Sequence, residues 1–462
     1  MRMKSPGVDG GGAQPPGTVT YCAQDCLVTY ELLASLRPRL DALSQGVYDF
    51  ERACQAPALA MMLRGMRRDP MRAIEAVRVL GAQAREHQEA LQRAGARFDY
   101  LKAWAPSPQA LARWLYGELG LPVKRDRKTG QPTTNEEALG RLKADPKCPD
   151  DVVPLIDAVL ALRAADKERE VLTQKADPDG RVRCSWSVGA TETGRWSCSK
   201  SPMGGGGNFQ AFGHEVRRAF VPDTGKVMIY ADLKQAESNV VAHLAGDPAY
   251  VAAHLEGDTH TLVARRIWPD LGDQVDLRKE CPPWDAKQPW RQWAKRVQHA
   301  ANYGQSHVGM ARLLHIPQRE ALNIQKAYFG AFRGIGAWHD RVKEELALRG
   351  ELTSPLGRRR QFLGRPWDAD TQREALAYLP QSTVGDLLNL GLLRAWEALD
   401  PHGVQFLAQG HDSVLFQCEE ARAEEMRKVV VEMLQIPVVV GPRTMRIGAD
   451  SKVGGDWGEA SS

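Results

Sequence analysis

The amino-acid sequence predicts an α+β protein. Stretches in which apolar residues recur at helical spacing cover most of the 462 residues. Two shorter parts, near residues 182–232 and 404–418, are rich in β-branched and aromatic residues and are typical of strands. No internal repeat is present. The resulting order of helix-rich, strand, helix-rich and strand segments is typical of an antiparallel sheet with helices attached to it.

The first part of the chain is predicted to be helical after a disordered start. Residues 1–17 are rich in Gly and Pro and are expected to be disordered. One amphipathic helix is expected from Thr18 to about Leu43, and helical spacing continues through Ala90.

A second helical part follows. The segment that begins at Pro106 predicts a helix that ends at Gly120 and Pro122, and Thr134 or Asn135 can cap the next helix. Between the two helices lies a basic turn, which in an unknown protein is usually just solvated: Lys124, Arg125, Arg127 and Lys128.

The pattern changes after the Pro-Asp-Gly turn at 178–180, near which a long helix from about residue 150 is expected to end. Strands are predicted at 182–186, 214–222 and 226–232, charged and Trp-rich helices from Ala236 to Arg349, a helix at 381–399, and two strands about a tight turn within 404–418.

Composition limits the classes of function. Lys and Arg number 61 and nearly balance the 57 Asp and Glu, so the net charge is only +4 and any polyanion site must be local. Eight scattered cysteines form no Cys-x-x-Cys pair, which favours reduced buried thiols over a zinc site. The start lacks the apolar core of a signal peptide, and no apolar run approaches the roughly 20 residues of a membrane span. A cytoplasmic protein without membrane contact is therefore expected.

Two aspartates stand where strands end. Asp232 closes the apolar run VMIYAD, and Asp412 lies in the turn of the hairpin within 404–418. Each alone is usually a turn or capping residue. Together, on adjacent antiparallel strands, they could bridge two divalent ions about 3.5 to 4 Å apart, as phosphoryl transfer from a triphosphate requires. Hard carboxylate oxygens favour Mg²⁺.

The segment RQWAKRVQHAANYG predicts a helix with one cationic face. Arg291, Lys295 and His299 recur every four residues and Tyr303 lies close to the same line. A basic stripe of this kind is most often a solvated helix face. The functional alternative is a row of groups that grips phosphates and stabilises negative charge on a leaving group.

These motifs and their order resemble the family A DNA polymerases, the family of bacterial DNA polymerase I and its phage relatives. ADLKQAESNVVAHLAGD is similar to the motif of the first metal-binding Asp, RQWAKRVQHAANYG to the nucleotide-binding finger helix, and GHDSVLF to the motif of the second metal-binding Asp. TETGRWS, SPLGRRR, LPQSTVGDLL and KVGGDWGE agree as well, and the likeness covers nearly everything after residue 45. The resemblance implies a polymerase right-hand architecture with an antiparallel-sheet palm and a mostly helical thumb and fingers.

The same resemblance implies a division of the chain. The expected parts are a disordered start at 1–17, a remnant of the 3′-5′ exonuclease domain at 18–45, a thumb at 46–185, a first part of the palm at 186–240, fingers at 241–371 and a second part of the palm at 372–462. Tyr21 and Asp25 match the last motif of that exonuclease domain. Because hydrolysis there needs further carboxylates, no proofreading by this polypeptide is expected.

The implied activity is template-directed addition of deoxynucleoside triphosphates to a primer 3′-hydroxyl, with two Mg²⁺ ions for which Mn²⁺ could substitute. The metal ligands would be Asp232, Asp412 and the Leu233 carbonyl, with Lys295 also catalytic. Glu237 resembles the steric gate that rejects a ribose 2′-hydroxyl. The residues implied to bind the nucleotide are Gln235, Glu237, His260, Arg291, Lys295, His299 and Tyr303.

Primer and template contacts, largely through the minor groove and phosphates, are implied for Arg195, Asn208, Gln210, Gln381, Gln409 and His411, and duplex phosphate contacts for Lys124, Arg125 and Lys128. For polar residues such as Asn208 and Gln210, a satisfied buried network or an exposed loop is an equally common explanation. The expected partners are primer-template DNA and deoxynucleoside triphosphates, bound by a monomer; a replisome or separate exonuclease partner stays open.

The chain departs from the family pattern at several positions. Leu233 and Lys234 replace the common Tyr-Ser, and GGGG at 204–207 lengthens the loop before Asn208. His299 stands where Phe or Tyr is usual, and Ser413 replaces the acid that usually follows the second Asp. Activity is expected to survive, with altered metal dependence. Two alternatives stay open: a single-subunit RNA polymerase or reverse transcriptase on the same palm, and a catalytically impaired protein that binds primer-template junctions.

Overall fold

The computed structural model describes residues 18–462, apart from Arg127, Lys128, Ala144, Pro146, Met203, Glu256, residues 284–287, His315 and Pro442. The chain divides into two compact units, Met1–Phe50 and Glu51–Ser462, each described by itself. The disorder predicted for residues 1–17 and the roles predicted for Arg127 and Lys128 lie outside the described residues.

The first unit contains helix α1 (Thr18–Leu36), a short 3₁₀ turn (Arg37–Arg39) and the start of helix α2 (Ala42–Arg64). The single helix predicted to reach Leu43 is therefore wrong. Pro38 lies in the turn and Leu40 is extended, with ψ at 134°, because proline lacks an N–H donor and disfavours a helical residue before it. All eight cysteines are free, but Cys22 and Cys26 on α1 are exposed, which corrects the expectation of buried thiols for these two.

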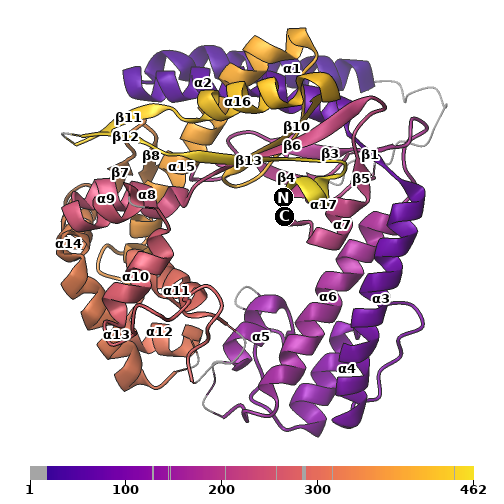
Figure 1. The fold of residues 1–462 in the computed structure, drawn as a ribbon. Helices are drawn as coiled ribbons and strands as arrows, with labels where there is room; N and C mark the ends of the chain where they lie inside the picture. Colours follow the sequence, from indigo (N-terminus) through magenta and orange to yellow (C-terminus); the bar gives the residue numbers. More distant parts are fainter. Residues whose placement is uncertain are drawn as a thin grey trace. The chain divides into compact units, whose positions relative to one another are not determined.

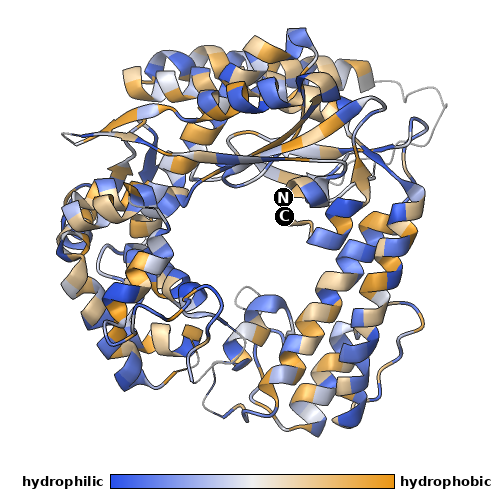
Figure 2. Ribbon diagram, in the orientation of Figure 1, coloured by the Kyte–Doolittle hydropathy of each residue, from blue (hydrophilic) through white to orange (hydrophobic). Residues whose placement is uncertain are grey.

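In the second unit, helices α3 (Pro70–Arg93) and α6 (Val153–Thr173) pack along one another (Figure 1). Both carry hydrophilic and hydrophobic residues along their length, as Figure 2 shows, which is typical of helices with one buried face. Helix α4 (Pro108–Ala112), the π-helical turn η2 (Arg113–Glu118) and helix α5 (Glu136–Lys143) attach to them. Asn135 caps α5, since its Oδ1 accepts a 2.8 Å hydrogen bond from the amide of Ala138.

Short strands join this helical part to the main sheet. Strand β1 (Met66–Arg68) pairs with β2 (Arg181–Val182) and β5 (Phe220–Val221), and β3 (Cys184–Ser187) forms a hairpin with β4 (Ser197–Lys200), followed by a 3₁₀ turn, η3 (Phe209–Ala211).

The strand predicted at 214–222 is wrong over its first half, which is helix α7 (His214–Arg218). Within the segment 214–222, the buried residues Val216, Ala219 and Phe220 recur at spacings of three and four. This is the helical period, whereas a half-buried strand would alternate.

The main sheet is antiparallel, in the order β13-β6-β10-β9. Its strands are β6 (Lys226–Leu233), β9 (Gln405–Gln409), β10 (Ser413–Glu419) and β13 (Ala449–Gly454). In the register, Ser413 of β10 and Asp450 of β13 lie opposite Asp232. Helices α16 (Ala423–Leu434) and α17 (Trp457–Ala460) pack on β6 and β13, and β11 (Pro437–Val440) pairs with β12 (Arg443–Arg446) beside them.

A helical body begins with α8, directly after the end of β6 that carries Asp232. It shares one core, which includes Trp293, Tyr328 and Trp338. Its helices are α8 (Ala236–Ala245), α9 (Pro248–Leu255), α10 (Thr259–Ile267), α11 (Trp290–Asn302), α12 (His307–Leu314), α13 (Gln318–Ala331), α14 (Arg333–Arg349) and the long α15 (Ala369–Leu399). None of the helices that the structure describes combines the length and the apolar character that a membrane span needs.

A buried ion pair ties the hairpin of β7 (Glu351–Thr353) and β8 (Arg359–Gln361) to α15. Arg358 Nη2 lies 2.8 Å from Asp386 Oδ1, and Nη1 lies 2.5 Å from a carboxylate oxygen of Glu51. The side chains of Arg358 and Asp386 are 9% and 4% exposed. Loss of Arg358 would leave Asp386 buried without compensation, and loss of Asp386 would leave the buried guanidinium with Glu51 as its one remaining carboxylate partner in this group.

We expect Asp386→Asn to lower the free energy of unfolding by about 3 to 5 kcal/mol, the usual effect of breaking a buried pair. Urea and thermal unfolding would measure this. Asp370→Asn, which removes a highly exposed partner of Arg373, serves as the control and should change stability by less than about 1 kcal/mol. Equal effects of the two substitutions would contradict the prediction.

Candidate active site

Asp232 and Asp412 meet at one end of the main sheet. Asp232 is the last but one residue of β6, and Asp412 directly precedes β10, its antiparallel neighbour. The amide of Leu233 donates a 2.9 Å hydrogen bond to the Asp412 carbonyl, which fixes the turn against β6. The two carboxyl groups are hydrogen-bonded to one another. The strand ends therefore bring two residues 180 positions apart in the chain into direct contact.

The environment of the pair favours a bound cation. Burial raises the pKa of both carboxyl groups, and the negative charge of Asp412 raises that of Asp232 further. Two buried carboxylates in contact repel one another unless a proton or a cation lies between them. Among the described residues, no cluster of three or more Asp, Glu, His or Cys forms a closed metal site. This donor set fits a hard divalent cation that takes its remaining oxygens from water and substrate.

A cavity of about 390 Å³ opens above the two aspartates. Every residue that the sequence predicted for metal or nucleotide binding lines it: Asp232, Leu233, Gln235, Glu237, His260, Arg291, Lys295, His299, Tyr303 and Asp412. Four further residues line it without having been predicted: Ala236, Ser238, Gln298 and Asn302.

Helix α11 presents its cationic face to this cavity. The opposite face, with Trp293, Val297 and Ala301, is buried in the helical core, so the side of the helix that faces the cavity is fixed by packing. The rings of His299 and Tyr303 lie edge to face, with centroids 4.7 Å apart. The predicted amphipathic arrangement of this helix is confirmed.

Arg291 is held by a carboxylate that sequence reasoning missed. Its Nε donates a 2.6 Å hydrogen bond to Asp258 Oδ2, which also accepts from the hydroxyl of Thr261. Burial alone would raise the pKa of Asp258, but the hydrogen bonds from Arg291 and Thr261 outweigh it and hold that pKa at about 2. Asp258 therefore stays charged and orients the guanidinium of Arg291.

Glu237, in the first turn of α8, links two other predicted residues. One of its carboxylate oxygens pairs with Arg195 and the other accepts a hydrogen bond from the hydroxyl of Tyr303. Gln235, just before α8, is left-handed with φ at 46°. Such a conformation is costly for a residue with a side chain and is most often found at functional sites.

Gln210 and Gln409 belong to a connected polar group that reaches the loop next to Arg195. Gln210 Nε2 donates to Gln409 Oε1 at 2.9 Å, and Gln409 Nε2 donates to Asn389 Oδ1 at 3.0 Å. Asn389 Nδ2 in turn donates to the carbonyl of Gly194, next to Arg195. Asn389 is a contact that the sequence did not predict, and it fixes the loop between β3 and β4 against α15.

The other residues predicted to contact DNA are not among those that line the cavity above Asp232 and Asp412. His411 is exposed in the β9–β10 turn and Gln381 is half-buried on α15. Lys124 is not a free cation, because its Nζ lies 2.5 Å from Asp145 Oδ2. Arg125 donates to the carbonyl of Gly130. Lys128 lies outside the described residues.

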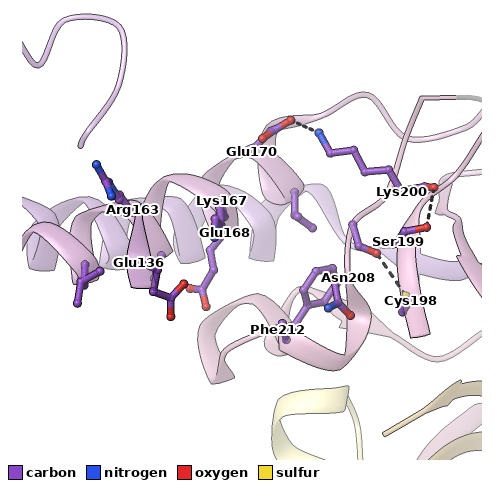
Figure 3. Close-up of a pocket in the computed structure, with 15 residues that line it drawn as sticks. Glu136, Arg163, Lys167, Glu168, Glu170, Cys198, Ser199, Lys200, Asn208 and Phe212 are labelled. Carbon is purple, nitrogen blue, oxygen red and sulfur yellow. Dashed lines mark hydrogen bonds and ion pairs between the residues drawn. The ribbon is translucent and has the colours of Figure 1, made fainter. Parts of the chain in front are cut away.

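Asn208 lines a second and larger cavity of about 720 Å³ between α6 and the β3–β4 hairpin (Figure 3). Its cationic residues are Arg163, Lys167 and Lys200, and its acidic ones are Glu136, Glu168 and Glu170. Glu170 pairs with Lys200, as Figure 3 shows. The balanced charges give no local excess of cations, so this cavity is not a strong phosphate site by itself.

Ser413 stands where the family usually has an acid, and its side chain forms a hydrogen bond within the main sheet. It is 1% exposed, and its Oγ accepts a 2.7 Å hydrogen bond from the hydroxyl of Tyr230. Asp450 lies opposite Asp232 on β13, but its side chain is 73% exposed and pairs with Lys234.

Comparison with known proteins shows the family of the chain. Residues 75–459 match the family model of DNA polymerase family A. The chain is 30% identical over 454 residues to the thermostable DNA polymerase I of Thermus filiformis, covering 95% of this chain and 51% of that protein. It is 30% identical over 444 residues to DNA polymerase I of Deinococcus radiodurans, covering 91% of this chain and 43% of that protein. The chain thus spans about half the length of these curated relatives.

The fold is also found among solved structures. The POL domain of Pol1 from M. smegmatis, in complex with DNA primer-template and dNTP, matches 89% of this chain and 70% of its own, with a TM-score of 0.71 and 24% sequence identity. This likeness confirms the predicted fold class, a mixture of helices and antiparallel sheets on a polymerase scaffold. With a family model that matches most of its length, the chain belongs to DNA polymerase family A.

Proposed function

We propose that this chain is a template-directed DNA polymerase that adds deoxynucleoside triphosphates to a primer 3′-hydroxyl by a two-metal mechanism. The observation that carries the proposal is the contact between Asp232 and Asp412 in a cavity faced by Arg291 and Lys295. Acidic groups that can hold cations and basic groups that can hold a triphosphate thus share one space. This is the constellation that phosphoryl transfer requires.

Asp232, Asp412 and the carbonyl of Leu233 would hold two Mg²⁺ ions, with Mn²⁺ as a substitute. When bound, such ions lower the pKa of the attacking hydroxyl and neutralise charge on the leaving pyrophosphate. Both carboxyl groups act as ligands in their deprotonated form. Ser413 adds no charge, so the site depends on these two aspartates more than a site with a third acid would.

The chain's own cationic residues bind and orient the triphosphate. Arg291, oriented by Asp258, and Lys295, one turn further along α11, face the cavity on the same side of the helix. Both stabilise the negative charge that gathers on the leaving group, and Lys295 is therefore assigned a catalytic role. His260 contacts the same phosphates, while His299 and Tyr303 stack near the incoming base and template.

Primer and template lie along residues that read the shape of the duplex. Arg195, Gln210, Gln409 and His411 would contact the terminal base pair. This is supported by the pairing of Arg195 with Glu237 of the cavity lining and by the bond of Gln210 to Gln409, three residues before Asp412. Gln381 and Asn208 would also contact primer or template near the terminal pair, whereas Lys124, Arg125 and Lys128 would contact duplex phosphates. The proposed parts are a thumb at 46–185, a palm at 186–240 and 372–462, and fingers at 241–371.

Glu237 is proposed to exclude ribonucleotides. We expect Glu237→Ala to lower the preference for dNTPs over NTPs at least about tenfold, because removing a carboxylate that obstructs the 2′-hydroxyl removes a repulsive element of specificity. Single-nucleotide incorporation with matched dNTP and NTP pairs measures this preference. Glu425→Ala, at an exposed acid on α16, is the control, and an unchanged preference in Glu237→Ala would argue against the gate.

Primer extension with the full chain tests the function itself. A labelled primer on a DNA template is incubated with dNTPs or NTPs, and with Mg²⁺, Mn²⁺ or a chelator. The proposal expects extension with dNTPs and either metal, and none with the chelator. Extension with NTPs alone would favour an RNA polymerase, and tight primer-template binding without any extension would favour an impaired binding protein.

A further inference from the structure

Helix α11 is anchored from behind by a buried tyrosine that the active-site chemistry does not use. Tyr250 on α9 is fully buried in the helical core. Its hydroxyl oxygen accepts hydrogen bonds from Gln298 Nε2 and, at 3.0 Å, from Asn302 Nδ2. Gln298 and Asn302 are one turn apart on α11 and also line the cavity. A single hydroxyl group thus holds the turn of α11 that lies between Lys295 and Tyr303.

The hydrogen atoms of this group can be assigned by counting donors. The Tyr328 hydroxyl lies 2.8 Å from Asn302 Oδ1 and 3.1 Å from the Tyr250 hydroxyl. Because an amide oxygen only accepts, Tyr328 gives its hydrogen to Asn302. Tyr328 also donates toward the Tyr250 hydroxyl and so shares this hydrogen between two acceptors. Asn302, Tyr250 and Tyr328 therefore form a closed ring of contacts, in which Asn302 donates to Tyr250 and Tyr328 donates to both.

The same count fixes the state of His260 at the cavity wall. Gln298 uses its amide nitrogen toward Tyr250, so its oxygen faces His260 Nδ1 at 2.6 Å and must accept. His260 Nδ1 therefore carries the hydrogen. Burial, followed by the positive charges of Arg291 and Lys295, lowers the pKa of His260 to about 4. Burial thus keeps His260 neutral, while a chain of contacts that begins at Tyr250 holds it in one tautomer.

A further contact secures the same end of α11. His339 Nε2 on α14 lies 3.0 Å from the carbonyl of Asn302, the last residue of the helix. Side chains of α9, α13 and α14 therefore all converge on one turn of α11. Such fully satisfied buried networks specify a single arrangement, because any rotation of the helix would leave buried donors without acceptors.

We propose that Tyr250 is a positioning residue for nucleotide addition: through Gln298 and Asn302 its hydroxyl fixes the rotation of α11, and with it the direction in which Arg291 and Lys295 face the triphosphate. This inference rests on the proposed function. It predicts that the hydroxyl matters for nucleotide use even though it touches neither substrate nor metal.

The test is Tyr250→Phe, which keeps the buried ring and removes only the hydroxyl. We expect the KM for dNTP to rise about tenfold, equivalent to about 1.4 kcal/mol, with the Kd for primer-template changed less than twofold. Tyr116→Phe is the matched control, because it removes a half-buried hydroxyl that donates to the carbonyl of Thr133, in a part of the chain away from α11. It should leave the KM for dNTP unchanged.

Two further measurements separate positioning from general loss of structure. Amide hydrogen exchange of the nucleotide-free chain should be faster in peptides of α11 in Tyr250→Phe than in the parent, and unchanged in the main sheet. Tyr328→Phe, which opens the ring but leaves both bonds from α11 to Tyr250, should raise the KM less, and the double variant should raise it by less than the product of the two single effects.

The results of these experiments separate the proposed function from the positioning role of Tyr250. A parent chain that extends no primer would refute the proposed function, while the exchange experiment would still report on the anchor. An active parent with an unchanged KM in Tyr250→Phe, or with exchange in α11 unchanged, would overturn the positioning role. If Tyr250→Phe fails to fold, the KM of Tyr328→Phe alone decides: a rise supports the role and parental behaviour refutes it.

Discussion

Asp412→Ala is expected to lower kcat for primer extension more than about 1,000-fold, a loss of about 4 kcal/mol of transition-state stabilisation. Asp412 and Asp232 are in direct contact, and no described acid completes a third position around them. A cation site with two carboxylates that loses one of them cannot hold two ions in alignment. Single-turnover extension with saturating dNTP and Mg²⁺ measures the effect.

Asp450→Asn is the matched control for this loss. Asp450 lies opposite Asp232 in the sheet but is exposed and paired with Lys234, so we expect its substitution to change kcat less than about threefold, the scale of an exposed pair. Primer-template binding should be retained in both variants, since neither residue carries positive charge toward the duplex. Full activity of Asp412→Ala would contradict the proposed mechanism.

Lys295→Met is expected to lower kcat/KM for dNTP incorporation by about 100-fold or more, the usual effect of removing one group that stabilises charge in a transition state. Lys295 lies in the middle of the cationic face of α11, and the cavity wall leaves its side chain facing Asp232 and Asp412. Because the same charge binds the ground-state triphosphate, KM should rise and kcat should fall together.

Arg296→Met provides the comparison on the same helix. Arg296 follows Lys295 but turns away from the cavity, donating to the carbonyl of Leu313 and lying over the ring of Trp293. Its loss removes an equal charge and weakens packing, yet kcat/KM should stay within about threefold of the parent in steady-state incorporation. A similar fall in both variants would mean that net charge, rather than the position of Lys295, governs nucleotide use.

Much of the candidate site could be predicted because its residues lie at places that secondary structure fixes. Asp232 ends a strand and Asp412 lies in a tight turn, so antiparallel pairing alone brings them together. The four-residue spacing from Arg291 to His299 likewise follows from helical geometry. The family resemblance then supplied the roles of Glu237 and His260, for which spacing gave no signal.

The contacts that orient these residues could not be predicted in the same way. Asp258 is an ordinary helix-capping residue in the sequence, and its pairing with Arg291 depends on how α10 and α11 pack. Tyr250 and Tyr328 are apolar core positions by pattern, and only the assembled core shows that their hydroxyls meet Asn302. The sequence held one signal for these contacts: Gln298 and Asn302 are polar residues on the buried side of α11. A buried polar residue needs a hydrogen-bond partner.

Errors in the predicted elements also have local causes. The break after Leu36 follows from Pro38, which outweighed the apolar periodicity of the surrounding sequence. At 214–222, the β-branched Val216 and the aromatic Phe220 suggested one strand, but Val216 lies in α7 and only Phe220 and Val221 form a strand, β5. Lys124, predicted to meet phosphates, is also paired with Asp145, a partner 21 residues away that only the folded turn brings close; its phosphate contact stays a prediction.

The central claim is that Asp232 and Asp412 share divalent cations beneath the cationic face of α11. A crystal structure of the chain with a dideoxy-terminated primer-template, a dNTP and Mn²⁺ tests it directly through anomalous scattering. The account predicts two manganese peaks about 3.5 to 4 Å apart, both within bonding distance of oxygens from Asp232 and Asp412, with the triphosphate against Arg291 and Lys295. Manganese bound elsewhere, or a triphosphate away from α11, would contradict it.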